Sequence, residues 1–120
     1  MISEYRYKFN INISHSIEST FEKKHIHSHN ISITVFVINN EQEFILYDEI
    51  EDTIKSYLEQ FNKRYINGIK PFDKIIPTIE NIGMEFYRNL KIILGENNYI
   101  LTRLEISEIP TRTYIINGEG

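Results

Sequence analysis

All four histidines of the chain fall between positions 15 and 29, and imidazole is a common metal ligand. His15 continues the buried face of a segment in which alternate residues are apolar. His27 and His29 continue, in the backward direction, the buried face of a second alternating segment. If the two segments pair as strands, these three imidazoles meet at one end of a sheet, on its core side. Three protein ligands leave one position on zinc open, which is the pattern of catalytic zinc sites.

The same spacing allows two other interpretations. His25 shares the parity of the other histidines and is an alternative ligand. A polar cluster at the end of two strands, without a metal, gives the same alternation of histidines.

The strands that would carry the histidines are predicted over residues 5–13 and 29–37, where apolar and polar types alternate. Two more strands are predicted at Tyr99–Ser107 and Arg112–Ile116. Residues 44–47 form either a short strand or the lead-in to a helix.

Two amphipathic helices are predicted between these strands. The first runs from Asp48 to Tyr65, with Asp48 as its N-cap, and the second follows Pro77 and Thr78 and has Gly95 as its C-cap. Their apolar faces consist of Ile50, Ile54, Tyr57, Leu58 and Phe61 in the first helix and of Ile79, Ile82, Phe86, Leu90 and Ile93 in the second.

This order of elements predicts one α+β domain over residues 1–120, an antiparallel four-stranded sheet with two helices packed on one face. The edges of such a sheet must be paired or guarded, and assembly of subunits does this. The 13 basic and 17 acidic residues give a net charge of −4, which argues against nucleic acid as a partner. The absence of cysteine excludes disulfides and a thiol nucleophile. We predict a cytoplasmic protein with no membrane segment, because no apolar run is long enough and no signal peptide is present.

Four short motifs occur in a characteristic order. They are Ile13-Ser14-His15, His27-Ser28-His29-Asn30, Pro77-Thr78-Ile79-Glu80-Asn81 and Leu104-Glu105-Ile106-Ser107-Glu108. In this order and at these separations, the chain resembles the 6-pyruvoyltetrahydropterin synthase and 6-carboxytetrahydropterin synthase family nearly from end to end. The resemblance implies the tunnelling fold (T-fold) and assembly as trimers stacked into hexamers.

The resemblance also implies roles for individual residues. His15, His27 and His29 would bind zinc, which in the family holds the hydroxyls of the substrate side chain. Glu108 would anchor a pterin, because a carboxylate can accept from its adjacent N–H and amino group. Thr78 and Glu80 would line the same pocket, although Thr78 is also a good helix N-cap.

The chain departs from the family at the positions that move protons. Lys23 stands where members carry a cysteine, and Asn62 and Lys63 stand where they carry an Asp-His pair. The candidate bases are therefore Lys23, Glu22, His25 and Lys63. Glu22 fits if the ligand pair is His25 and His27 instead of His27 and His29, because some relatives place a glutamate three residues before the first histidine of the pair.

The sequence therefore predicts a zinc-dependent pterin lyase that acts on a dihydroneopterin triphosphate-type substrate by an altered proton path. Basic residues for the triphosphate would be Lys23, Lys24, Lys63 and Arg64. The alternative is a diverged member that binds zinc and a pterin- or purine-like ligand, or that carries out a different reaction on it.

Overall fold

The protein is described by a computed structural model, which covers residues 3–16, 26–39 and 46–118. Five strands form one sheet: β1 (Tyr5–His15), β2 (His27–Asn39), β3 (Arg64–Tyr65), β4 (Tyr99–Ile109) and β5 (Arg112–Asn117). The helices are α1 (Tyr47–Glu59), the single 3₁₀ turn η1 (Ile66–Gly68) and α2 (Ile79–Gly95). Within these ranges no helix is long and apolar enough to span a membrane.

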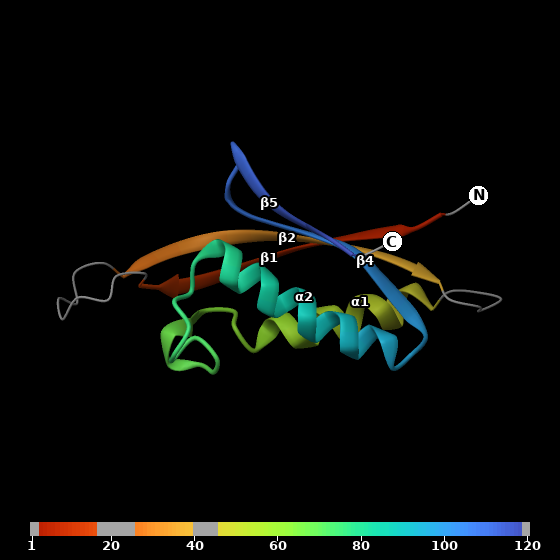
Figure 1. The fold of residues 1–120 in the computed structure, drawn as a ribbon, viewed down its shortest axis with the longest axis horizontal. Coiled ribbons are helices and arrows are strands. Elements are labelled where there is room, and N and C mark those ends of the chain that lie inside the picture. Colours follow the sequence, from red (N-terminus) through yellow and green to blue (C-terminus); the bar gives the residue numbers. More distant parts are fainter. Residues whose placement is uncertain (1–2, 17–25, 40–45, 119–120) are drawn as a thin grey trace.

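The strands lie in the order β3-β1-β2-β4-β5. All neighbours are antiparallel except β1 and β3, which pair in parallel through Ile13 and Ser14. Figure 1 shows α1 and α2 on the same side of the sheet. The predicted α+β architecture is therefore confirmed, but the sheet has five strands and not four. The two residues of β3 are too few to produce an alternating pattern.

The core lies between the helices and the inner face of the sheet. Alternate residues of β1, β2 and β4 are buried there, because successive side chains of a strand point to opposite faces. The helices contribute the apolar faces predicted for them: Ile50, Ile54, Tyr57 and Leu58 from α1, and Ile82, Phe86 and Leu90 from α2.

Three predicted helix ends differ from the structure. The helix α1 begins one residue before Asp48, so Leu46 is its N-cap and Asp48 lies in the first turn, near the positive end of the dipole. It ends at Glu59 rather than Tyr65, because the chain turns at Lys63 (φ 61°) and then pairs with β1. Gly95 is the last residue of α2 and not its C-cap, which is Glu96.

Both strands that carry the histidines extend beyond their predicted ends, β1 to His15 and β2 back to His27. They pair directly, with His15 opposite His27 and Ile13 opposite His29. The predicted pairing of these strands is confirmed. Of the predicted segment 44–47, residues 44 and 45 lie outside the described residues, Leu46 caps α1, and Tyr47 begins it.

Candidate metal and ligand site

His15 is the buried member of the site, at 4% exposure. Its Nδ1 lies 2.7 Å from the carbonyl oxygen of Pro77. A carbonyl can only accept, so Nδ1 carries a proton, and in the neutral imidazole Nε2 then keeps its lone pair. A metal-binding histidine typically has its other ring nitrogen held in this way.

Asn67 in η1 holds the backbone next to His15. Its Nδ2 donates to the carbonyl oxygen of Ser16 and its Oδ1 accepts from the Ser16 N–H, both at 2.8 Å. The end of β1 is therefore fixed from two directions, through the Pro77 carbonyl at the ring and through Asn67 at the main chain.

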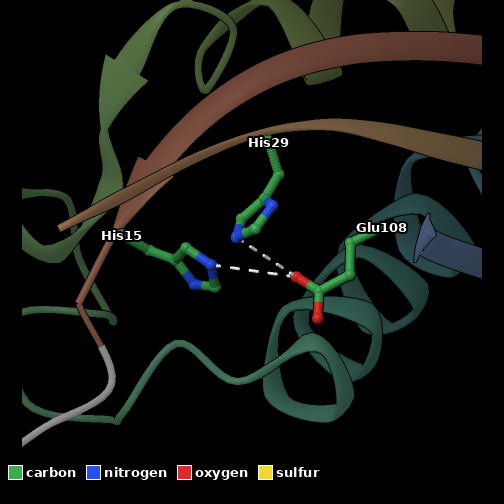
Figure 2. A group of neighbouring side chains, drawn as sticks. All are labelled: His15, His29 and Glu108. Carbon is green, nitrogen blue, oxygen red and sulfur yellow. Dashed lines mark ion pairs between the residues drawn. The ribbon is translucent and has the colours of Figure 1, made fainter. Parts of the chain in front are cut away.

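Glu108 brings a carboxylate to the histidines from β4. Its Oε2 lies 3.7 Å from Nε2 of His29 and 3.9 Å from Nε2 of His15 (Figure 2). One ligand atom from each of these three residues lies within 4.8 Å of the other two. The side chains of His29 and Glu108 are partly exposed, at 30% and 26%, so solvent and ligands can reach the group.

His27 lies beside this group but is not part of it. Its ring stacks on that of His29 with 5.9 Å between the ring centres, and the residue is exposed. The rings of His15 and His29 are closer, at 5.1 Å, and nearly perpendicular. The structure thus brings His15, His29 and Glu108 together, with His27 at the outer rim.

The chemistry of these donors fits a divalent cation. Two imidazole nitrogens and a carboxylate oxygen converge, and zinc binds these donor types at about 2.0–2.2 Å. Ligand atoms of a tetrahedral site with such bonds lie about 3.4 Å apart, close to the two distances measured from Glu108. The donors of this group therefore suit zinc without a large rearrangement.

A cavity of about 690 Å³ opens beside the group, between the end of β1, the start of α2 and the hairpin of β4 and β5. Its lining includes His15, Thr78, Glu80, Glu108, Arg112 and Tyr114. Thr78 is also the N-cap of α2, since its Oγ1 accepts from the N–H of Asn81 at 3.1 Å. Glu80 is exposed in the first turn of that helix.

The hairpin that follows Glu108 is braced by Ser107. Its hydroxyl lies within hydrogen-bond distance of the carbonyl oxygens of Ile109 and Arg112 and donates to one of them at a time. Arg112, whose carbonyl oxygen takes part in this bracing, is one of the residues that line the cavity.

The positions matched to the family's Asp-His pair lie away from the cavity. The Oδ1 of Asn62 accepts from the N–H of Asn12 at 2.9 Å, and its Nδ2 donates to Glu59 at 3.3 Å. Lys63 is exposed, and its backbone N–H donates to the carbonyl oxygen of Asn12. Neither residue lines the cavity. Glu22, Lys23, Lys24 and His25 lie outside the described residues, and Arg64 is exposed in β3.

Three features of the site were not predicted from the sequence: the Pro77 carbonyl, Asn67 and Arg112. A backbone carbonyl carries no signal in a sequence. Asn67 lies in the three-residue turn η1, which is too short to give a periodic signal in the sequence. Arg112 lies four residues after Glu108 across a tight turn, and the two strands predicted on either side of this turn gave only a weak indication of its role.

Comparisons with known proteins agree with this architecture. The family model described as 6-pyruvoyl tetrahydropterin synthase matches residues 4–119. The 6-pyruvoyl tetrahydropterin synthase of Caenorhabditis elegans is similar in structure, with a TM-score of 0.82, 17% identity, and 99% of this chain and 97% of that chain covered. An uncharacterized protein of Wolinella succinogenes follows with a TM-score of 0.77, 13% identity and 99% of both chains covered.

Two variants of the Plasmodium vivax 6-pyruvoyltetrahydropterin synthase, in which a catalytic glutamate is replaced by alanine or by cysteine, are also similar. Each has a TM-score of 0.66, 12% identity and 97% of both chains covered. A search of curated proteins finds no match. At these identities the structural likeness establishes the fold, and the predicted T-fold is confirmed.

Proposed function

The chain belongs to the 6-pyruvoyl tetrahydropterin synthase family, and on this premise we propose that it is a zinc-dependent pterin lyase that acts on a dihydroneopterin triphosphate-type substrate. The observation that carries the proposal is the convergence of His15, His29 and Glu108 on one point beside the cavity. A pterin lyase must hold the pterin ring in a cavity and carry out chemistry on the side chain of that ring. It therefore needs a cavity and a metal-binding group next to each other.

In this proposal His15, His27 and His29 hold the zinc. The fixed tautomer of His15, with Nε2 free, supports its assignment as a ligand. His27 is opposite His15 in the strand pair and stacks on His29, so a rotation of its exposed side chain would bring it toward the same point. A bound zinc ion supplies Lewis acidity, which polarises oxygens of the substrate and acidifies neighbouring C–H and O–H groups.

Glu108 is the proposed anchor of the heterocycle. A pterin presents an N–H and an amino group side by side, and a carboxylate accepts both. Thr78 and Glu80 line the same cavity, and the hydroxyl of Thr78 can still donate while its oxygen caps α2. The guanidinium of Arg112 suits the phosphate groups of such a substrate, as do Lys23, Lys24, Lys63 and Arg64 if their side chains reach the cavity.

The base is proposed to come from Glu22, Lys23 or His25 rather than from the family's cysteine. The Plasmodium vivax enzyme has a catalytic glutamate, which supports Glu22 by side-chain type. In that case His25 and His27 form the alternative ligand pair. Lys63 is the weakest of the proposed bases, because it is exposed and does not line the cavity.

A second function is favoured by the side chain of Asn62. It is engaged with the backbone of Asn12 and with Glu59, so this relay position serves the structure and not proton transfer. The alternative is therefore a diverged member that binds zinc and a pterin- or purine-like molecule without the family's reaction, or with a different one. In either case we propose a cytoplasmic homo-oligomer, a trimer or a hexamer.

A turnover assay tests these functions. Zinc-loaded protein is incubated with 7,8-dihydroneopterin triphosphate, and mass spectrometry follows the loss of triphosphate. We expect a new product that depends on the metal. We also expect one of the variants Lys23→Met and Glu22→Gln to lose this product while its zinc content stays unchanged. Unchanged substrate, together with retained binding of pterin, would support the binding function instead.

A further inference from the structure

Glu108 has been assigned to the heterocycle, but its position points to a second role. Figure 2 shows one carboxylate oxygen turned toward the two imidazoles and the other pointing away from both. The oxygen that faces the histidines is Oε2, at 3.7 Å and 3.9 Å from their Nε2 atoms.

These two distances are too long for hydrogen bonds, and in the neutral form of His15 the donor is also missing. The Nδ1 proton of His15 is held by the Pro77 carbonyl, so the Nε2 lone pair faces a carboxylate oxygen. A lone pair and an anionic oxygen repel each other unless a cation or a proton lies between them. His15 is only 4% exposed, so water screens this repulsion poorly.

We propose that Glu108 is itself a metal ligand, together with His15 and His29, as long as no heterocycle is bound, and that it leaves the metal when it binds the heterocycle. The inference rests on the proposed function, because it needs both a metal and a heterocycle at this site. It changes the role of Glu108 from a passive anchor to a ligand that exchanges between two partners.

The two roles exclude each other because each requires a different orientation of the carboxylate. The bidentate grip on a pterin edge uses both carboxylate oxygens. Coordination of the metal needs Oε2 to face His15 and His29, as it does in the structure, whereas the other oxygen points away from both rings (Figure 2). To turn both oxygens toward the heterocycle, the carboxylate must rotate and move Oε2 away from the histidines, so Glu108 leaves the metal when it takes up both hydrogen bonds.

This exchange makes the two binding events thermodynamically linked. If the heterocycle removes Glu108 from the metal, it lowers the affinity for the metal, and the metal lowers the affinity for the heterocycle by the same factor. A substrate with side-chain hydroxyls can replace the lost ligand, whereas unsubstituted pterin cannot. Unsubstituted pterin is therefore the sharper probe of the link.

The test uses Co²⁺ as a spectroscopic substitute for zinc, with affinity measured by competition with a chelating dye. Glu108→Gln and Glu108→Ala are compared with the wild type and with Glu96→Gln, which changes an exposed glutamate at the other end of α2. We expect the two Glu108 variants to lose at least about tenfold in Co²⁺ affinity, since even residues outside the ligand shell change it by that factor. Glu96→Gln should bind as the wild type does.

The second arm adds unsubstituted pterin to the Co²⁺-loaded proteins. In the wild type we expect weaker Co²⁺ binding and a d–d absorption spectrum that moves toward that of Glu108→Gln. In Glu108→Ala the pterin should leave the spectrum unchanged. Circular dichroism melting curves identify any variant that fails to fold, and Glu108→Gln preserves the shape of the side chain for that reason.

The outcomes separate this inference from the proposed function. If both Glu108 variants bind Co²⁺ with wild-type affinity and spectrum, Glu108 is not a ligand, and the inference is overturned while a histidine metal site stands. If His15→Ala and His29→Ala also leave Co²⁺ binding unchanged, the proposed metal site itself is wrong.

Discussion

The imidazole of His15 shows how single residues are positioned in this fold. It is buried at the end of β1, its Nδ1 is bonded to the carbonyl oxygen of Pro77, and the next residue is bonded twice to Asn67. These contacts come from segments about 50 and 60 residues away in the chain. The loop before α2 thus orients the ring through the Pro77 carbonyl, and η1 fixes the adjacent backbone through Asn67.

Tyr57 in α1 provides a prediction about pH. Burial raises the pKa of Tyr57 to about 12 from 10.0, and the nearby Glu85 adds to the effect, whereas a hydrogen bond from Asn89 at 2.8 Å opposes it. The raised pKa means that the folded state favours the neutral phenol. Its contribution to stability is complete below about pH 10 and is lost as the pH rises toward about 12, by roughly 2 kcal/mol.

The measurement is denaturant unfolding of the wild type and of Tyr57→Phe from about pH 9 to about pH 12. Phenylalanine has no proton to lose, so we expect the free energy of unfolding of the variant to fall less steeply over this range. The buried ring is kept in the variant, and the Asn89 amide retains its bond to Glu85 at 2.7 Å. Equal slopes for both proteins would show that the Tyr57 hydroxyl ionises as easily in the folded state as in the unfolded one.

At this scale the sequence predicted which residues come together better than it predicted what each one does. The alternation along the strands predicted that His15 and His29 lie on one face of the sheet. In the structure their ring centres are 5.1 Å apart. Glu108 was found only through the family resemblance, because it is about 80 residues from the histidines and belongs to an ordinary strand pattern. The proximity of its Oε2 to their Nε2 atoms depends on the register between β2 and β4, which no local pattern contains.

Elements were predicted well where long stretches show one period and poorly where the chain changes direction. The long strands β1, β2 and β4 and the helices α1 and α2 have the predicted type. However, α1 ends six residues before Tyr65. Tyr65 lies four residues after Phe61, so it continues the helical spacing of the apolar face. Pairing of β3 with β1 overrides that spacing, and this is a tertiary contact.

Gly83 controls how closely α2 approaches the sheet. A Cβ atom added at this position would lie 2.9 Å from Cγ2 of Ile106 and 3.4 Å from the ring of Tyr114. Ile106 is fully buried, so its branched side chain has little room to move. Gly83→Ala should therefore destabilise the protein by roughly 1 kcal/mol, because overpacking exceeds the gain in helix propensity.

Gly95 is the matched control for this substitution. It is the last residue of the same helix, and nothing lies within 4 Å of a Cβ added there. Gly95→Ala should be neutral or stabilising by up to about 1 kcal/mol. Thermal unfolding of the two variants measures the contrast, and a Gly83→Ala protein as stable as Gly95→Ala would mean that α2 can move away from β4 without cost.

The whole molecule leaves two sheet edges available for pairing. β3 covers only Ile13 and Ser14 of β1, so most of the outer edge of β1 is unpaired within the described residues. At the other end of the sheet, β5 pairs with β4 and with no other strand of the described part of the chain. Exposed strand edges of this length favour association with other chains. We therefore expect the chain to assemble through β1 and β5.

Ile115 tests this assembly, because it lies on β5 with 41% of its surface exposed, on the face opposite Tyr114 and Ile116. A lysine on an edge strand opposes pairing with another strand. Ile115→Lys should lower the mass measured by light scattering toward the 14.3 kDa of one chain. Ile92→Lys introduces the same charge at a more exposed isoleucine, at 65%, on α2, and it should leave the wild-type mass unchanged. If Ile92→Lys dissociates the assembly and Ile115→Lys does not, the subunits meet through the helices, and the sheet edges must be protected by another means.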